Sequence, residues 1–153
     1  MALTNAEKNT RIDWELRGQS APSLPGSWYA ALLSAIPSGG LPNGTEITAG
    51  GVARQAMTRA LATWSGTQGA GSTSASSGTS GTSSNNADIV FAASASAAIS
   101  GAVAVGLFDA SSGGNLRHWG YIVDTGGSPI TRSWADGDTV MVEAGALQFV
   151  IGW

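Results

Sequence analysis

Two adjacent glycines between apolar runs constrain the fold of this chain more than any other feature. Residues 103–109 and 116–123 are mostly apolar or aromatic, and the segment 110–115 between them reads Ala-Ser-Ser-Gly-Gly-Asn. Gly113 and Gly114 adopt positive φ angles without a Cβ penalty, so the chain can reverse direction at this point. The pattern therefore predicts that residues 103–109 pair with residues 116–123 in an antiparallel hairpin.

Short apolar runs separated by turn residues continue through the rest of the chain. Residues 28–36 are apolar almost throughout and lie between Pro/Gly turns, which favours a buried strand, although their alanines leave a helix open. Residues 139–143 and 146–151 alternate around Ala-Gly and predict a terminal hairpin. Further strands are expected at 52–64, 87–91 and 130–134.

This count indicates an antiparallel β-sandwich or jelly roll of about eight strands after one short helix. Aromatic side chains bury the most surface each and are expected to form its core. The main core candidates are Trp28, Phe91, Phe108, Trp119 and Phe149.

The first residues have the pattern of a short amphipathic helix over 4–17. Thr4 and Glu7 have capping-box spacing, and Gly18 is a suitable stop. A helix this short is marginal alone, so it must dock on its own domain or on a neighbouring subunit. Its thin apolar stripe is the pair Ile12 and Leu16, with Leu3 and Trp14 near the edges of the stripe.

Residues 65–86 form a low-complexity segment of small polar residues without charge. Such a run buries too little apolar surface to offset its ordering entropy, so we expect a flexible loop inserted between strands. The predicted organisation is an N-terminal helix or arm at 1–18 and a β-sandwich domain at 28–153 that carries this loop.

The surface is expected to be unusually neutral. Charged residues make up 11% of the chain, less than half the usual share of about a quarter, and the net charge is −3. A neutral surface suits a protein that is packed against neighbours. The seven basic residues are scattered, which argues against nucleic-acid binding. No apolar run approaches the roughly 18 residues of a membrane span.

Few residues have the chemistry of a catalytic or metal site. His118 is the one histidine, and no nucleophile elbow accompanies it, so a packed or rim histidine is expected. With no cysteine, no thiolate metal site is expected. Four carboxylates are the remaining candidates, either as Ca²⁺ ligands or as turn caps: Asp109, Asp124, Asp136 and Asp138. The Asp136-Gly137-Asp138 segment lacks the ligand spacing of a calcium loop, so no bound metal is predicted. Together with the missing nucleophile elbow, this predicts neither an enzyme nor a cofactor.

Interface residues are the better-supported prediction. Arg54 is expected to form an inter-subunit salt bridge with an acid such as Glu46, the alternative being an exposed strand arginine. Apolar residues of the helix and two tryptophans are expected to contact partners for the same reason. The interface candidates are Leu3, Ile12, Trp14, Leu16, Arg54, Trp134 and Trp153.

Five segments, in order along nearly the whole chain, carry a resemblance: residues 3–9, 28–33, 46–55, 106–120 and 136–147. They resemble segments of small tailed-phage virion proteins, which are described as tail fibre or head decoration proteins. Val52 departs from it, since the family more often has Tyr there. The resemblance implies a virion structural role.

The first functional hypothesis is a capsid decoration or cement protein on the outer head shell. It would act as a homo-oligomer, for example a trimer, and would bridge major capsid proteins. The alternative is a tail fibre or tail-tip adhesin in which Trp119, Tyr121 and Trp134 stack on host glycans. A cell-surface hydrolase ranks far behind, because its acid and base residues are missing.

Overall fold

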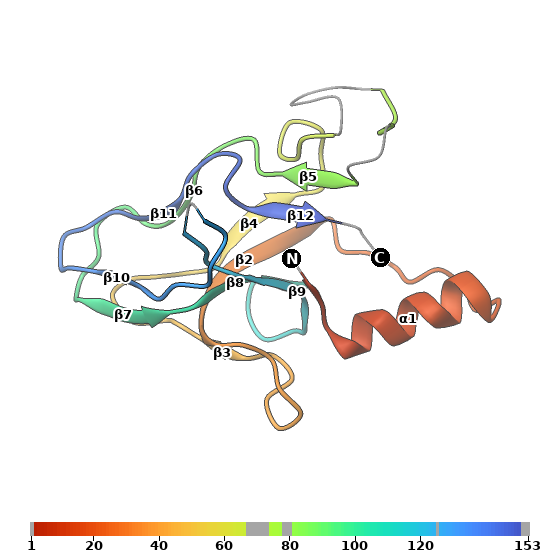
Figure 1. Ribbon diagram of the computed structural model, residues 1–153, viewed down its shortest axis with the longest axis horizontal. Coiled ribbons are helices and arrows are strands. Elements are labelled where there is room, and N and C mark those ends of the chain that lie inside the picture. The colour runs from red at the N-terminus through yellow and green to blue at the C-terminus, as the bar shows by residue number, and fades with distance from the viewer. Residues whose placement is uncertain (1, 67–73, 78–80, 125, 151–153) are drawn as a thin grey trace.

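The computed structural model describes residues 2–66, 74–77, 81–124 and 126–150 (Figure 1). The predicted fold class is confirmed: the chain is mainly β with antiparallel pairing and a short N-terminal helix. Within the described residues, no helix combines the length and apolar character that membrane crossing requires. The elements are β1 (Ala2–Leu3), α1 (Asn5–Leu16), β2 (Ser27–Ala35), β3 (Thr45–Glu46), β4 (Gln55–Thr58), β5 (Thr82–Ser84), β6 (Ile89–Ala92), β7 (Ile99–Ala102), β8 (Ala104–Phe108), β9 (Leu116–Tyr121), β10 (Arg132–Trp134), β11 (Val140–Val142) and β12 (Gln148–Val150).

One main sheet organises the molecule. Its strand order is β1-β9-β8-β2-β3, and β4 also pairs with β2. The remaining strands of the described chain form the two-stranded ribbons β10–β7, β11–β6 and β12–β5. Figure 1 shows β2 running through the middle of the molecule, with the three ribbons spread above and to the left.

Side-chain alternation along β2 divides the core into two clusters. Ala30 and Leu32 lie in the larger cluster, together with residues of β6, β7 and β11. Ala31 and Leu33 belong to a smaller cluster, which also contains residues of β8 and β9. Because successive strand residues face opposite sides of a sheet, the larger cluster lies between the main sheet and the ribbons. Of the predicted core aromatics, Phe91 and Phe108 are buried, whereas Trp28 and Trp119 are partly buried.

The predicted hairpin around the two glycines is confirmed. β8 and β9 pair antiparallel, with Leu107 opposite His118. Gly113 and Gly114 have φ angles of 62° and 67°. A Cβ at Gly114 would lie 2.5 Å from Asp109 Oδ1, so this position needs glycine for space as well as for backbone conformation.

The predicted terminal hairpin is wrong. β11 pairs with β6 and β12 pairs with β5, so the two C-terminal strands join different ribbons. Asn85 explains the separation, because its side chain bonds the backbone of both Glu143 and Leu147 at the ends of the intervening turn. This amide attaches the turn to the segment before β6 and directs each strand to a distant partner.

Two segment boundaries also differ from expectation. The segment 65–86 is not loop throughout, since β5 lies within it and pairs with β12 through the backbone. Ladder hydrogen bonds there replace the apolar burial that the segment lacks. The strand expected at 52–64 is limited to β4, because a turn at 60–64 ends it; the amide of Trp64 donates to the carbonyl of Ala60.

Candidate assembly interface

Helix α1 projects from the β body as an arm (Figure 1). Thr4 is its N-cap, and its Oγ1 accepts a hydrogen bond of 3.3 Å from the amide of Glu7. The reciprocal half of a capping box is not used, since the Thr4 amide donates to the carbonyl of Arg117. The N-terminus of the helix is therefore tied directly to β9 of the main sheet.

A buried carboxylate fixes the root of this arm. Glu7 is 5% exposed, and its Oε2 lies 3.4 Å from Nη1 of Arg117. Nε of Arg117 also donates to Oδ2 of Asp109 at 2.9 Å. Burial raises the pKa of Asp109, but the Asn115 amide and the Arg117 guanidinium outweigh it and lower that pKa overall. The arm, β9 and the β8–β9 turn thus share one charged network.

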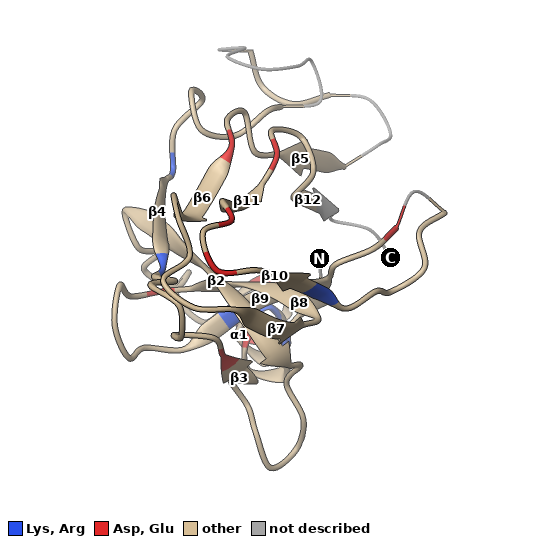
Figure 2. Ribbon diagram, turned by 90° about the vertical axis from the view of Figure 1, so that its left-hand side faces the viewer, with Lys and Arg blue, Asp and Glu red and all other residues tan. Residues whose placement is uncertain are grey.

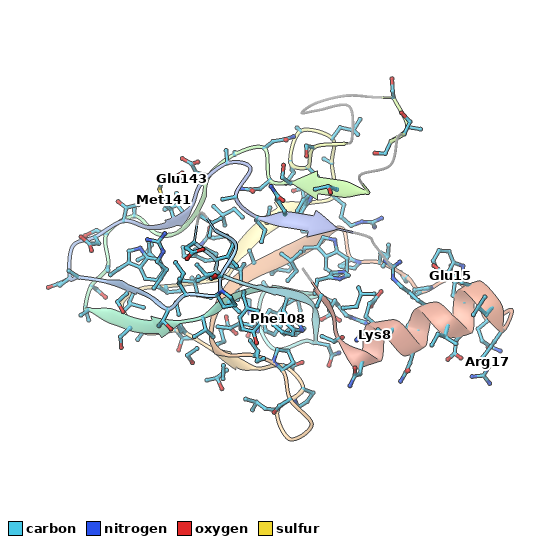
Figure 3. The ribbon with its side chains drawn as sticks, viewed as in Figure 1. Lys8, Glu15, Arg17, Phe108, Met141 and Glu143 are labelled. Atoms are coloured by element: carbon cyan, nitrogen blue, oxygen red, sulfur yellow. The ribbon has the colours of Figure 1, made fainter. Side chains whose placement is uncertain are left out.

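The apolar side chains of the arm stay in solvent. Ile12 is 49% exposed, Trp14 44% and Leu16 80%, and Glu7 is the buried residue of the helix. Ile12 and Leu16 share one face, while Trp14 is two residues from each and lies toward the opposite side. Figure 3 shows Lys8 and Glu15 projecting from this helix, and Arg17 just past its C-terminal end. The expected docking of this stripe therefore does not occur within the chain's own domain.

Leu3 differs from the other arm candidates. It lies in β1 and pairs with His118 of β9, so it belongs to the main sheet and is half-buried there.

The expected ion pair of Arg54 and Glu46 exists, but it lies within one chain. Nε and Nη2 of Arg54 donate to the two carboxylate oxygens of Glu46 at 2.9 and 2.7 Å. Nη1 donates to the carbonyls of Ala110 and Gly113, and the guanidinium lies 3.7 Å from the ring centroid of Phe108. The Arg54 side chain is 9% exposed, so the inter-subunit expectation is corrected: the arginine secures the β8–β9 turn internally.

The tryptophan candidates have different outcomes. Trp134 is partly buried and packs against the larger core cluster. It also lines a cleft of about 910 Å³ between the edge of β9 and strands β10, β11 and β12. Trp119 and Tyr121 form an edge-on pair with centroids 5.3 Å apart, and Tyr121 is 46% exposed. Trp153 lies outside the described residues.

Three of the four carboxylates proposed as alternative metal ligands accept from backbone amides of turns: Asp109, Asp124 and Asp138. Asp124 accepts from the amides of Gly126 and Ser128, and Asp138 accepts from that of Ala135. Across the described parts of the chain, no group of three or more His, Cys, Asp or Glu side chains has the geometry of a metal site. Figure 2 shows the charged residues scattered over a ribbon that is mostly tan.

His118 is a packed histidine at the root of the arm. It is 5% exposed, and its ring meets Trp28 edge-on with centroids 5.1 Å apart. Burial lowers the pKa of His118 to about 4, and the charges of Arg11, Arg117 and the N-terminus add to this effect.

This depressed pKa predicts a pH-dependent stability. The unfolded chain takes up a proton near pH 6.5, whereas the folded chain resists protonation down to about pH 4. The free energy of unfolding therefore has its full value above pH 6.5. It falls by roughly 3 kcal/mol as the pH decreases toward 4. Urea unfolding at pH 7.5 and 4.5 measures this loss of stability. The His118→Gln variant should lose much less stability between the two pH values than the unmodified chain does. If the variant lost as much, His118 would not be the cause of the pH dependence.

Sequence reasoning missed the link between Glu7 and Arg117, which are 110 positions apart. No local pattern relates residues at that separation. The capping-box spacing did single out Glu7, because it predicts that the Glu7 carboxylate accepts from the amide of Thr4. It could not show that this carboxylate would bind Arg117 of β9 and not the Thr4 amide.

A β body with few charged residues and a projecting helix that exposes Ile12, Trp14 and Leu16 suits a structural protein. The family model described as Podophage GP4 fiber I protein gp80 matches residues 2–150. The chain belongs to this family of phage fiber proteins, and the predicted resemblance to phage virion structural proteins is confirmed. No curated protein matches the sequence. The family description favours the fibre alternative and gives no specific support to head decoration.

Proposed function

We propose that this chain is a non-enzymatic subunit of a phage tail fibre and that it assembles through α1 with copies of itself. The observation that carries the proposal is the arm, which exposes Ile12, Trp14 and Leu16 while its root is fixed by Glu7 and Arg117. Family membership supports the fibre role.

The geometry suits an assembly element. A rigid root limits the ordering entropy that the arm loses on docking, which leaves more of the contact energy for binding. Aromatic and large apolar side chains dominate interface energies, and Trp14 is of the type most often found at such positions. Fibres are symmetric assemblies of identical chains, so one exposed arm per chain is repeated at every contact.

Charged substitutions on the arm test the assembly role. Ile12→Asp combined with Leu16→Asp should convert the oligomer to monomers in light scattering coupled to size-exclusion chromatography. Because both side chains are exposed, the stability of each folded chain should change by only about 0.5 kcal/mol per site. Leu41→Asp is the matched control, since Leu41 is 39% exposed in the loop before β3 and lies outside the arm. An oligomer that survives the arm variant would overturn the proposal.

A second experiment tests the location. Antibody labelling of purified virions in the electron microscope should mark the tail appendages. Protein quantitation should give a few dozen copies, as a fibre requires. Labelling over the head shell with hundreds of copies would overturn the fibre role and would favour the head decoration hypothesis.

A further inference from the structure

The cleft of about 910 Å³ beside β9 is a concave apolar surface of the chain. Its wall contains Trp119, Tyr121, Val123 and Trp134. Tyr121 and Val123 are each 46% exposed, whereas the two tryptophans are partly buried. Of the nine large apolar side chains that are exposed in the described chain, three lie on α1 and two in this cleft. The chain thus has one protruding and one concave apolar surface, and exposed apolar surfaces mark sites of protein contact.

The arm of the same chain does not fill this cleft. The Thr4 amide donates to the carbonyl of Arg117, and the Glu7 carboxylate pairs with its guanidinium, so the direction of α1 is fixed at its root. Figure 1 shows α1 extending away from β10 and β11, and the described lining of the cleft contains no residue of α1. A helix that enters the cleft therefore belongs to another molecule. A second hollow, of about 550 Å³, already has Glu7 and Arg11 of its own α1 in its wall, so a second helix there would meet the first.

Another copy of the chain offers a helix face that matches the cleft. Ile12 and Leu16 are exposed and lie one turn apart on α1, and an amphipathic helix anchors in an apolar groove with side chains at this spacing. With 3.6 residues per turn, the buried Glu7 lies about 140° around the helix from Ile12. The stripe of Ile12 and Leu16 therefore faces away from its own body and is open to a neighbour.

The charges beside the two surfaces are complementary. Lys8 lies one turn before the stripe and Glu15 lies at its edge, while the cleft lining contains Glu143 and Arg132. Among the described residues, no ion pair includes Lys8, Glu143 or Arg132, and Glu15 has only a long contact of 3.9 Å with Arg11. Lys8 placed against Glu143 gives the incoming helix one direction, and in that direction the second charge of each surface also meets its opposite.

We infer that the stripe of Ile12 and Leu16 docks in this cleft of a neighbouring copy. The inference rests on the proposed assembly through α1 and names the surface that receives the arm. Because arm and cleft are different surfaces, the contact is heterologous, and each chain gives one arm and receives another. A heterologous contact closes into a ring when the rotation between neighbours divides a full turn, which leaves no arm and no cleft uncovered. Pairing of two arms with each other would leave both clefts open.

Cross-linking of the full chain tests the contact, because the sequence contains no cysteine that would interfere. Leu16→Cys places a thiol on the stripe, and Val123→Cys places one in the cleft. The two variants, one of them with an affinity tag, are co-expressed and treated with a short bismaleimide. Mixed dimers should be at least tenfold more abundant than the dimers that either variant gives alone. Leu41→Cys replaces the cleft variant in the matched control and should give no such excess, since Leu41 is exposed but lies outside the cleft.

Charge reversal tests the direction of the docked helix. Lys8→Glu and Glu143→Lys should each weaken the oligomer about fivefold in sedimentation experiments at low salt, because each brings two like charges together. The two changes combined should restore the dissociation constant to within about twofold of that of the unmodified chain. Asp136→Lys is the matched control, since it makes the same change at an exposed acid outside the cleft, and it should not rescue Lys8→Glu.

The outcomes separate this inference from the proposed function. Dimers formed by Leu16→Cys alone would show that arms pair with arms, which overturns the inference and leaves assembly through α1 standing. Mixed dimers no more abundant than in the Leu41→Cys control, or equal rescue of Lys8→Glu by Asp136→Lys, would also overturn it. If the cleft variant in assembled virions were cross-linked to a different phage protein, the cleft would have another occupant and the inference would fail. An oligomer that survives the paired aspartate substitutions of the stripe would overturn the proposed function itself.

Discussion

Replacing Arg54 with methionine is expected to lower the free energy of unfolding by about 3–5 kcal/mol, because one partner of a buried ion pair is lost. The guanidinium makes three hydrogen bonds to Glu46 and one each to the carbonyls of Ala110 and Gly113. Methionine fills similar space but leaves the Glu46 carboxylate, which is 22% exposed, and both carbonyls without these donors. Urea unfolding at pH 7 measures the change.

Two further variants separate charge from geometry. Arg54→Lys keeps the positive charge but cannot reach Glu46 and the turn carbonyls together, so an intermediate loss is expected. Arg132→Met is the control, since Arg132 lies exposed in β10 and should change stability by only about 0.5 kcal/mol. If Arg54→Lys matched the unmodified chain, or Arg54→Met lost no more than the control, the stabilising role of the bidentate geometry would be refuted.

The Arg54 bonds also connect the core to the proposed assembly site. They hold the β8–β9 turn from one side, and Asp109 at the start of that turn binds Arg117 on the other. Arg117 in turn binds Glu7 at the root of the arm. A change that loosens this turn should therefore reorient α1 and also destabilise the sheet. Arg54 and Arg117 together hold the turn in place from its two sides.

Features set by local chemistry could be predicted from the sequence. The helix start follows from the Thr4 hydroxyl and the Glu7 amide, and the main hairpin follows from Gly113 and Gly114. Short-range turn chemistry and alternation decide such elements, so neighbouring residues contain the needed information. The mainly β fold class follows for the same reason.

Features set by distant contacts could not be predicted. Residues 139–143 and 146–151 have the pattern of a hairpin, yet Asn85, about 60 positions earlier, directs them into separate ribbons. The arm root depends on Arg117, which is 110 positions from its partner Glu7. Composition indicated a protein with few charged residues, but it could not show which tryptophans would remain exposed.

Asn85 is the second position at which a large effect is expected. Its side chain is fully buried: Nδ2 donates to the carbonyls of Ala87 and Glu143 at 2.8 and 2.9 Å, and Oδ1 accepts from the amide of Leu147 at 2.9 Å. Asn85→Ala removes all three bonds and leaves the buried amide of Leu147 without this acceptor and two carbonyls without this donor, which should cost about 2–4 kcal/mol. Asn86→Ala is the adjacent control and should cost about 1 kcal/mol, because its bonds to Leu61 and Ala62 are exposed.

Asn85→Asp tests the donor side of this network separately. The carboxylate still accepts from Leu147 but faces the carbonyls of Ala87 and Glu143, with which a charged oxygen cannot bond. At pH 7 this variant should therefore be less stable than Asn85→Ala. Burial beside two carbonyls raises the pKa of the new acid, so part of the difference should disappear in urea unfolding at pH 5, where a proton restores one donor. If Asn85→Asp were as stable as the unmodified chain at pH 7, the two carbonyls would not depend on this amide, and another cause would have to separate β11 from β12.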